Sequence, residues 1–373
     1  MNGLFRRDTF TGFGPCSLTG GEFPLFGGRG KAGRLRAVVC RDAPRVPGVY
    51  GMVDAQGTLI YVGKARSLRS RLLSYFVPSR PDKAAAIVAD SRRLVWEPAR
   101  SEFAALVREL ELIRRWRPRW NVAGQPLRQR RVYLCLGRPP ALYAFVAVRV
   151  PSTATACWGP FPGQRRTRTA CDRLNDWFRL RDCPEKQTMR FADQNELFPV
   201  SYTAGCLRHE IGRCLAPCAA ACSQADYAFH VSAAGDFLEG RDRTALDALE
   251  RQIAESSKDL RFEQAAALNE RREPLAWLWR HLERLREART ITGVYQVRDH
   301  DGGLSWYVLH NGVVRRTVRV PDDCDQRQKL MNDIRASKPS AVGVPGLNEV
   351  DIVLLVCGWF RRHKTERANL YPF

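Results

Sequence analysis

Two short strand patterns joined by a tight turn constrain this chain more than any other local feature. Residues 49–53 (VYGMV) and 58–63 (TLIYVG) have the composition of strands, and the segment between them, DAQG, is typical of a turn. The second pattern ends at Gly63, where a missing side chain lets the backbone approach a ligand closely. The sequence therefore predicts a β-hairpin that ends at a glycine.

Helical patterns follow this hairpin. Residues 64–76 predict a basic helix with leucines on one side, and residues 83–90 are rich in alanine. The clearest helix begins after Ser101, a suitable N-cap, and ends near Trp116, shortly before a proline. We expect a small mixed sheet flanked by these helices.

Several side chains in this region could together cut a phosphodiester bond. That reaction needs an activated water, a charge clamp on the phosphate and help for the leaving oxygen. Glu109 lies on the apolar side of the long helix, where a carboxylate is costly unless a bound cation compensates it. Judged on residue types alone, core tyrosines beside a solvated basic helix are the simpler interpretation. The candidate residues are Tyr50, Tyr61, Lys64, Arg71 and Glu109.

The charge of the chain favours a polyanionic partner. Its 60 basic and 39 acidic side chains give a formal net charge of +21. A preference for arginine over lysine can reflect codon bias, but such a bias does not explain the shortage of acids. Nucleic acid is therefore the first expected partner and a membrane surface the second.

Three segments in this order resemble the GIY-YIG nuclease motif: PGVY at 47–50, YVGKA at 61–65 and LRSRL at 68–72. Val49 replaces the isoleucine of that motif, which is a mild change. Ser101-Glu102, Glu109 and the RPRWN segment at 117–121 continue the likeness. The resemblance is strongest to the N-terminal nuclease of the UvrC family, which acts in bacterial nucleotide excision repair.

The resemblance implies a role for each matching residue. Tyr50 and Tyr61 would orient or deprotonate the attacking water, and which of them is the base stays open. Arg71 would bind the scissile phosphate, and Lys64 would support the water and the tyrosines. Glu109 would be the ligand of one Mg²⁺ or Mn²⁺, and Asn121 would brace the site. Further DNA contacts are expected from Gly63, Arg66, Arg69, Arg114 and Arg117.

The chain has twelve cysteines, and four of them form a second candidate site: Cys183, Cys206, Cys214 and Cys218. The spacing C-x7-C-x3-C differs from a zinc knuckle, and four thiolates suit either Zn²⁺ or a cubane iron–sulfur cluster. Cys222 and His209 lie nearby, and we interpret Cys222 as non-ligating. A cytoplasmic location disfavours disulfides, so the other cysteines are expected to be isolated, buried or incidental: Cys16, Cys40, Cys135, Cys157, Cys171, Cys324 and Cys357.

Two more segments resemble UvrC. FRLRDC at 178–183 and IGRCLAPC at 211–218 are similar to its cysteine-rich region, which implies a structural [4Fe–4S] cluster. LRFEQAA at 260–266 resembles the UVR motif, a helical hairpin through which UvrC meets UvrB. Arg272 and Pro274 depart from that motif, and a proline kinks or ends a helix. Two interpretations of the hairpin thus stay open: it docks to UvrB, or it is an ordinary helical hairpin that closes the domain.

We predict an α+β multidomain chain. Its expected parts are an N-terminal, flexible extension (1–43), a GIY-YIG nuclease domain (44–130), a connecting α/β segment (131–182), a cysteine-rich iron–sulfur region (183–243), a UVR-like helical hairpin (244–286) and a small α/β, β-rich C-terminal part (287–373). No apolar run is long enough to span a bilayer, so no membrane partner and a cytoplasmic location are expected.

The expected function is that of a metal-dependent DNA endonuclease of excision repair. It would hydrolyse one phosphodiester, because the chain lacks the length for the second nuclease of full UvrC. The resemblance implies that this cut lies 3′ to a bulky lesion in double-stranded DNA. The resemblance is thus to a short, single-nuclease UvrC form such as the homologue Cho. Two alternatives stay open: a GIY-YIG endonuclease that cuts branched or flapped DNA independently of UvrB, and a non-catalytic DNA-binding repair scaffold.

Overall fold

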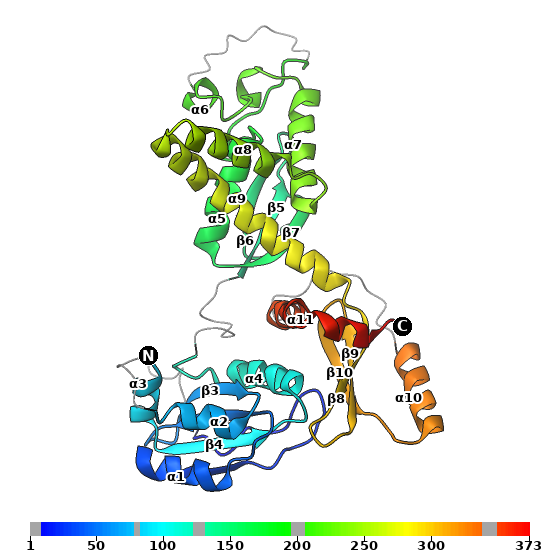
Figure 1. The fold of residues 1–373 in the computed structure, drawn as a ribbon. Helices are drawn as coiled ribbons and strands as arrows, with labels where there is room; N and C mark the ends of the chain where they lie inside the picture. Colours follow the sequence, from blue (N-terminus) through cyan, green and yellow to red (C-terminus); the bar gives the residue numbers. More distant parts are fainter. Residues whose placement is uncertain (1–8, 78–82, 122–130, 195–205, 338–348) are drawn as a thin grey trace, which may run out of the picture. The chain divides into compact units, whose positions relative to one another are not determined.

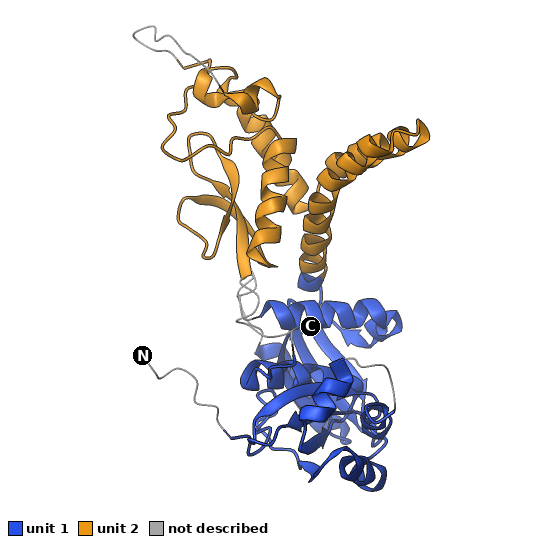
Figure 2. Cartoon of the chain, turned by 90° about the vertical axis from the view of Figure 1, so that its left-hand side faces the viewer, with its two compact units in different colours: residues 1–128, 288–342, 348–373 blue, residues 129–287, 343–347 orange. Residues whose placement is uncertain are grey.

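The structure is a computed structural model, and its elements are shown in Figure 1. It describes residues 9–77, 83–121, 131–194, 206–337 and 349–373. The chain forms two compact units, coloured separately in Figure 2. Unit 1 contains residues 1–128, 288–342 and 348–373, and unit 2 contains residues 129–287 and 343–347. Sheets and helices occur in both, so the predicted α+β architecture is confirmed.

The first sheet of unit 1 contains the predicted hairpin. The strand order is β1-β4-β2-β3, and each neighbouring pair is antiparallel. Strands β2 and β3 correspond to the two strand patterns of the sequence, which confirms the hairpin. The bounds are β1 (Phe26–Arg29), β2 (Gly48–Val53), β3 (Leu59–Ala65) and β4 (Arg93–Pro98).

Helices and the N-terminal segment contribute to two cores on this sheet. Side chains alternate between the faces of a strand. Tyr50 and Met52 of β2 therefore join a core with α1, α2 and α3, whereas Val49 and Val53 join a core with α4. The bounds are α1 (Ala32–Asp42), α2 (Leu68–Ser74), α3 (Lys83–Asp90) and α4 (Glu102–Trp116).

Helix α4 begins and ends as the sequence predicts, whereas α2 does not. The Ser101 hydroxyl accepts a hydrogen bond from the backbone N–H of Ala104 at 3.1 Å, which makes it the N-cap. The predicted basic helix over residues 64–76 is wrong at its start, because Lys64 and Ala65 still belong to β3. Pairing with β2 satisfies the backbone there and keeps it extended.

The N-terminal extension is folded over residues 9–43, contrary to the flexible segment that we expected. Phe10 and Phe13 are buried in the core beside α4. Strand β1 pairs with β4 at the sheet edge, and α1 contributes Leu35 and Val39 to the opposite core. Residues 1–8 lie outside the described residues. Apolar burial and strand pairing with distant residues thus hold this extension on the sheet.

The C-terminal residues also belong to unit 1. The expected alternation over residues 291–320 is confirmed as a meander, and the sheet has the order β10-β9-β8-β11. Its strands are β8 (Gly293–Arg298), β9 (Leu304–His310), β10 (Val313–Arg319) and β11 (Leu370–Tyr371). The helices are α10 (Cys324–Ala336), α11 (Val350–Arg362) and the 3-10 helix η2 (Lys364–Asn369).

Unit 2 is built on a sheet of order β6-β5-β7, with helices α5, α7, α8 and α9 contributing to its core. The strands are β5 (Arg131–Gly137), β6 (Tyr143–Ala147) and β7 (Ala154–Pro162). The helices are α5 (Gln164–Trp177), α6 (Leu207–Glu210), the 3-10 helix η1 (Pro217–Ala219), α7 (Gln224–Glu239), α8 (Thr244–Lys258) and α9 (Phe262–Arg289).

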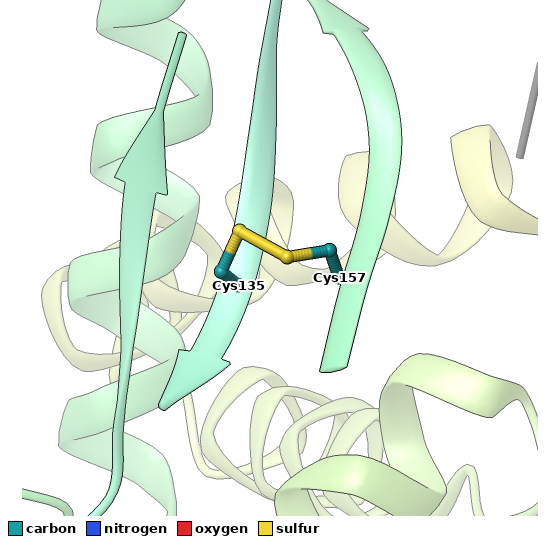
Figure 3. The surroundings of a disulfide bond; sticks show 2 residues. All are labelled: Cys135 and Cys157. Carbon is teal, nitrogen blue, oxygen red and sulfur yellow. A yellow bond between two sulfur atoms is a disulfide. The ribbon is translucent and has the colours of Figure 1, made fainter. Parts of the chain in front are cut away.

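A disulfide in this sheet corrects one expectation. Cys135 on β5 and Cys157 on β7 were expected to be isolated, but they are cross-strand partners and form a disulfide (Figure 3). Directly opposed residues on antiparallel strands bring their Cβ atoms within about 5 Å of each other. Register between strands, which the sequence does not display, thus places the two thiols together.

Helices α8 and α9 form the expected helical hairpin. Leu249 of α8 and Leu275 of α9 are buried in the core of unit 2. Helix α9 continues through Pro274, so of the two effects expected from this proline, a kink or an end, the helix does not end there. Burial of the flanking apolar side chains offsets the missing N–H. Among the described residues, no helix is long and apolar enough to cross a membrane.

A buried histidine ties α9 to β7. The Nε2–H group of His281 donates to the Pro160 carbonyl at 3.1 Å, and its ring lies against Phe161 and Trp277. Burial lowers the pKa of His281 to about 4. The folded chain therefore holds this ring neutral at pH values where the unfolded chain protonates it, since an ordinary histidine has a pKa of about 6.5.

The stability of unit 2 should consequently depend on pH. We expect the free energy of unfolding to fall as the pH drops from about 6.5 to about 4, with a loss of ~3 kcal/mol from His281. Denaturant unfolding followed by circular dichroism at several pH values measures this slope. His281→Leu should flatten it, and His300→Leu, at an exposed histidine of unit 1, should not. An unchanged slope in His281→Leu would contradict the prediction.

Candidate active site

Three tyrosines and an arginine meet on the face of the first sheet that α2 covers. Tyr50 lies on β2, Tyr61 on β3, and Tyr75 directly follows α2. The Tyr50 and Tyr75 hydroxyls are 2.9 Å apart. Arg71 of α2 donates through Nε to the Tyr50 hydroxyl at 3.2 Å and through a terminal nitrogen to the Tyr75 hydroxyl at 3.4 Å. These hydrogen bonds join β2 to α2, and the ring of Tyr61 lies beside both tyrosines, with centroids 6.1 Å from Tyr50 and 6.4 Å from Tyr75.

Gly63 makes this arrangement possible. It pairs with Tyr50 across the β2–β3 ladder. A Cβ atom at this position would lie 2.5 Å from the Tyr50 hydroxyl oxygen. A side chain at position 63 would therefore displace the Tyr50 ring. The missing Cβ atom of Gly63 instead lets the Tyr50 hydroxyl lie close to the backbone of β3.

The hydroxyls of Tyr50 and Tyr61 keep their protons at neutral pH. Burial raises the pKa of Tyr50 well above its usual range, and burial together with the nearby Tyr75 raises the pKa of Tyr61 to about 12. A neutral hydroxyl can orient a water molecule, but a tyrosine takes a proton from water only after it has lost its own, and a nearby cation stabilises the phenolate that this loss leaves. Arg71 is the protein cation placed to do so.

Glu109 is a half-buried carboxylate at the edge of this network. Its Oε1 atom accepts the backbone N–H of Lys64 at 3.0 Å, and within the described residues no hydrogen bond or ion pair reaches Oε2. Burial raises the pKa of Glu109, although the Lys64 N–H and the charges of Lys64 and Arg71 oppose that shift. A carboxylate with an open oxygen in such a place is suited to a hard divalent cation.

Asn121 closes the edge of the site. It lies buried beyond the end of α4, and its Oδ1 accepts the N–H of Val62 at 2.9 Å. Its Nδ2 donates to the Val62 carbonyl at 2.8 Å. This amide pair attaches the segment after α4 to the middle of β3, beside Tyr61.

The other predicted basic residues are held by partners within unit 1. The Lys64 ammonium lies 2.8 Å from Glu102, which also pairs with Arg66, so Lys64 does not reach the tyrosines. Arg69 donates to the carbonyl of Ala43 at 2.7 Å. Arg114, also predicted to contact DNA, pairs with Asp351 at 3.2 Å. Arg117, the last of these predicted residues, is the C-cap of α4 and has a left-handed backbone.

Two parts of the site escaped the sequence analysis. Tyr75 is four residues after Arg71, a spacing at which helical neighbours meet, and this was the available signal. The second part is the support of α4 from the N-terminal residues and β4. Arg108 of α4 forms a buried ion pair with Glu97 of β4, with nitrogen–oxygen distances of 3.1 Å and 3.2 Å. It also donates to the Gly14 and Pro15 carbonyls.

C-terminal aromatic residues hold the N-terminal half of α4. Phe103 is fully buried, with ring centroids 5.1 Å from Tyr295, 4.8 Å from Tyr307 and 5.4 Å from Trp359. The first two contacts are edge-on, which aromatic pairs favour. The helix that carries Glu109 is therefore fixed by residues from the far end of the sequence.

Removing this aromatic contact should destabilise unit 1. We expect Phe103→Ala to lower the free energy of unfolding by about 3–5 kcal/mol, because it leaves a cavity among buried rings. Denaturant unfolding measures the change. Phe229→Ala removes the same side chain from a position that is 73% exposed and should leave stability nearly unchanged. Equal effects of the two substitutions would show that the C-terminal contact does not stabilise α4.

The four cysteines predicted as ligands lie in one neighbourhood of unit 2. Burial, together with the charges of Cys183, Cys218 and Cys206, raises the pKa of Cys214 to about 11, so the other three thiols lie within electrostatic reach of Cys214. Burial also raises the pKa of the buried Cys222 to about 11. In the described part of the chain, no group of three or more His, Cys, Asp or Glu side chains is arranged to hold a metal ion.

Comparisons with known proteins agree with the site. Residues 46–122 match the family described as the UvrC-like GIY-YIG domain, and residues 132–237 match the UvrC/Cho excinuclease middle domain. UvrABC system protein C of Methylobacillus flagellatus is 32% identical over 240 residues, and that of Sphingopyxis alaskensis is 35% identical over 258 residues. These alignments cover 64% and 65% of this chain but only 38% and 36% of the relatives.

A solved structure is also similar to part of this chain. The magnesium-bound GIY-YIG N-terminal endonuclease domain of Thermotoga maritima UvrC is 35% identical, with a TM-score of 0.22. That alignment covers 24% of this chain and 97% of the Thermotoga domain. The two consecutive family regions define the class of protein that this chain is similar to: it is UvrC/Cho-like, with a GIY-YIG region followed by a middle domain.

Proposed function

We propose that the chain is a metal-dependent DNA endonuclease that hydrolyses a single phosphodiester bond. The observation that carries this proposal is the Tyr50–Tyr75–Arg71 network together with the half-buried Glu109, which is bound to β3 and within electrostatic reach of Arg71. Such a site provides groups that orient water, a guanidinium for the phosphate and a carboxylate for a cation. The formal net charge of +21 suits a polyanionic substrate.

Each residue has a distinct task in this proposal. Glu109 would hold Mg²⁺ or Mn²⁺, which when bound lowers the pKa of water and neutralises charge on the phosphate. The tyrosine hydroxyls orient the attacking water, and Arg71 binds a phosphate oxygen whose charge grows in the transition state. Lys64 contributes through its backbone N–H to Glu109, and Asn121 positions β3.

The similarity to UvrC/Cho domains and to UvrABC system protein C supports a role in nucleotide excision repair. We propose that the chain makes the incision 3′ to a bulky lesion in double-stranded DNA. It would act with UvrB, which the α8–α9 hairpin is suited to meet, because Leu260 and Phe262 at its tip are 73% and 65% exposed. Exposed apolar side chains at the end of a helical hairpin are typical of a protein contact.

An incision assay tests the nuclease. A lesion-bearing duplex is incubated with the chain, UvrA, UvrB and Mg²⁺, and nicks are mapped on a sequencing gel. We expect a nick 3′ to the lesion, and we expect Glu109→Gln to slow it by at least about 10²-fold while preserving DNA binding. Glu111→Gln is the matched control, because it removes the same charge from α4 at a side chain that pairs with Arg108 instead.

The same assay separates the other candidate functions. Cutting of flapped or branched DNA without UvrB would favour a GIY-YIG nuclease of a different kind. DNA binding without cleavage at any metal concentration would indicate a repair scaffold. Equal nicking by Glu109→Gln and the wild type would remove Glu109 from the reaction.

We further propose that Cys183, Cys206, Cys214 and Cys218 hold a [4Fe–4S] cluster. Cys214 is buried and the other three are half-buried, and thiolates gathered in such a place require compensating positive charge. A cubane cluster binds each cysteine to a separate iron atom and needs wider spacing than a single Zn²⁺. The Cys214 sulfur also accepts the backbone N–H of Ala216 at 3.3 Å, and such hydrogen bonds stabilise cluster ligands. The role is structural, since hydrolysis transfers no electron.

Spectroscopy distinguishes the two metals. Protein purified without oxygen should be brown, absorb broadly near about 400 nm and contain about four iron atoms per chain. Cys214→Ser should lose this absorbance, whereas Cys324→Ser, which changes an exposed cysteine, should retain it. A colourless protein with equimolar zinc would overturn the iron–sulfur assignment.

A further inference from the structure

A hollow of about 430 Å³ lies in unit 2, between the end of α5, the loop around Gly212 and the α8–α9 hairpin. Its apolar lining consists mainly of Trp177, Leu249 and Leu275. Leu249 and Leu275 are buried, whereas Trp177 is half-buried. Its volume is in the range of small-ligand sites. None of these residues belongs to the tyrosine and carboxylate site, which is in unit 1.

Arginines line the same hollow. Arg173 comes from α5, Arg213 from the loop and Arg271 from α9, and a single carboxylate, Asp176, faces them. Asp176 is already engaged by Arg173 at 3.4 Å, by Arg213 at 3.6 Å and, through its other oxygen, by Arg208 at 2.6 Å. Guanidinium groups therefore exceed carboxylates around the hollow.

One of these arginines has no structural task within the described residues. Arg271 is exposed and takes part in no hydrogen bond or ion pair there. Its neighbour Arg272 differs, since it binds the Asn269 side chain and lies 3.5 Å from Glu250. An arginine that served the hairpin alone would be expected to pair as Arg272 does. Arg271 instead leaves its donors available to a ligand at the hollow.

An aromatic and apolar floor beneath an arginine rim matches one ligand chemistry well. Nucleobases stack on aromatic side chains, and guanidinium groups bind the phosphates beside them. We propose that this hollow binds one nucleotide of a single-stranded segment of nucleic acid, with the base against Trp177 and the adjoining phosphates at Arg213 and Arg271. The inference goes beyond the proposed nuclease function and does not depend on it, because binding here requires neither the metal nor cleavage.

A binding assay in EDTA tests the site without any cutting. The full chain is titrated with a 12-nucleotide single-stranded DNA at several salt concentrations. Arg213→Ala/Arg271→Ala should weaken binding about tenfold and reduce the slope of log affinity against log salt by about 1.4, as expected for two lost phosphate contacts on a single strand. Arg165→Ala/Arg251→Ala is the matched control, because it removes two exposed arginines from α5 and α8 that do not line the hollow.

Base stacking provides a second, independent readout. A 2-aminopurine placed in the oligonucleotide should lose fluorescence on binding, and Trp177→Leu should remove most of that quenching. Trp177→Phe, which keeps an aromatic ring and a similar core, should retain it. Competition then distinguishes sources of the ligand: an unlabelled oligonucleotide should displace the probe at micromolar concentration, and deoxythymidine monophosphate at much higher concentration.

Three outcomes would overturn the proposal. The control pair of arginine substitutions could weaken binding as much as the pair at the hollow, which would indicate general attraction by charge. Quenching could persist in Trp177→Leu at full affinity. An acidic peptide could displace the probe better than DNA does, which would make the hollow a protein-binding site. Each result can occur with the incision activity intact, so failure here is distinguishable from failure of the proposed nuclease function.

Discussion

The antiparallel register of β2 against β3 is the constraint on which the candidate active site depends. It sets Tyr50 opposite Gly63, the residue whose missing side chain leaves room for the tyrosine. A shift of β3 by one residue would turn Tyr61 to the opposite face of the sheet from Tyr50. The same register keeps Lys64 in the strand, where its N–H meets Glu109. One pairing pattern thus positions both the hydroxyls and the carboxylate.

Local signals made this part of the fold predictable. The hairpin depends on a turn and two short strands, and α4 depends on the Ser101 cap and a run of apolar side chains, so each is specified by residues close in sequence. The order of the motif residues then indicated that Tyr50, Arg71 and Glu109 belong together. Tyr75 was missed because a helical neighbour of Arg71 has no sequence feature that separates it from an ordinary core tyrosine.

Contacts between distant residues account for the remaining differences. Phe10 and Phe13 belong to a glycine-rich segment that we predicted to be an extension, but both side chains are buried in the core between the sheet and α4. Cys135 and Cys157 are 22 residues apart and meet only through strand register. The packing of Tyr307 on Phe103 likewise depends on a contact between β9 and α4, which lie far apart in the sequence. Composition and periodicity describe the face that a residue presents, but not the partner that it finds.

The aromatic contact at Phe103 has a consequence for the order in which the molecule matures. Polypeptides leave the ribosome from the N-terminus, and contacts of high sequence separation close late. Helix α4 therefore emerges long before Tyr295 and Trp359 exist to cover it. The carboxylate of Glu109 reaches its final setting only after the rest of the chain has been translated. A truncated translation product that ends before these residues therefore lacks the aromatic side chains that cover Phe103 in the complete unit 1.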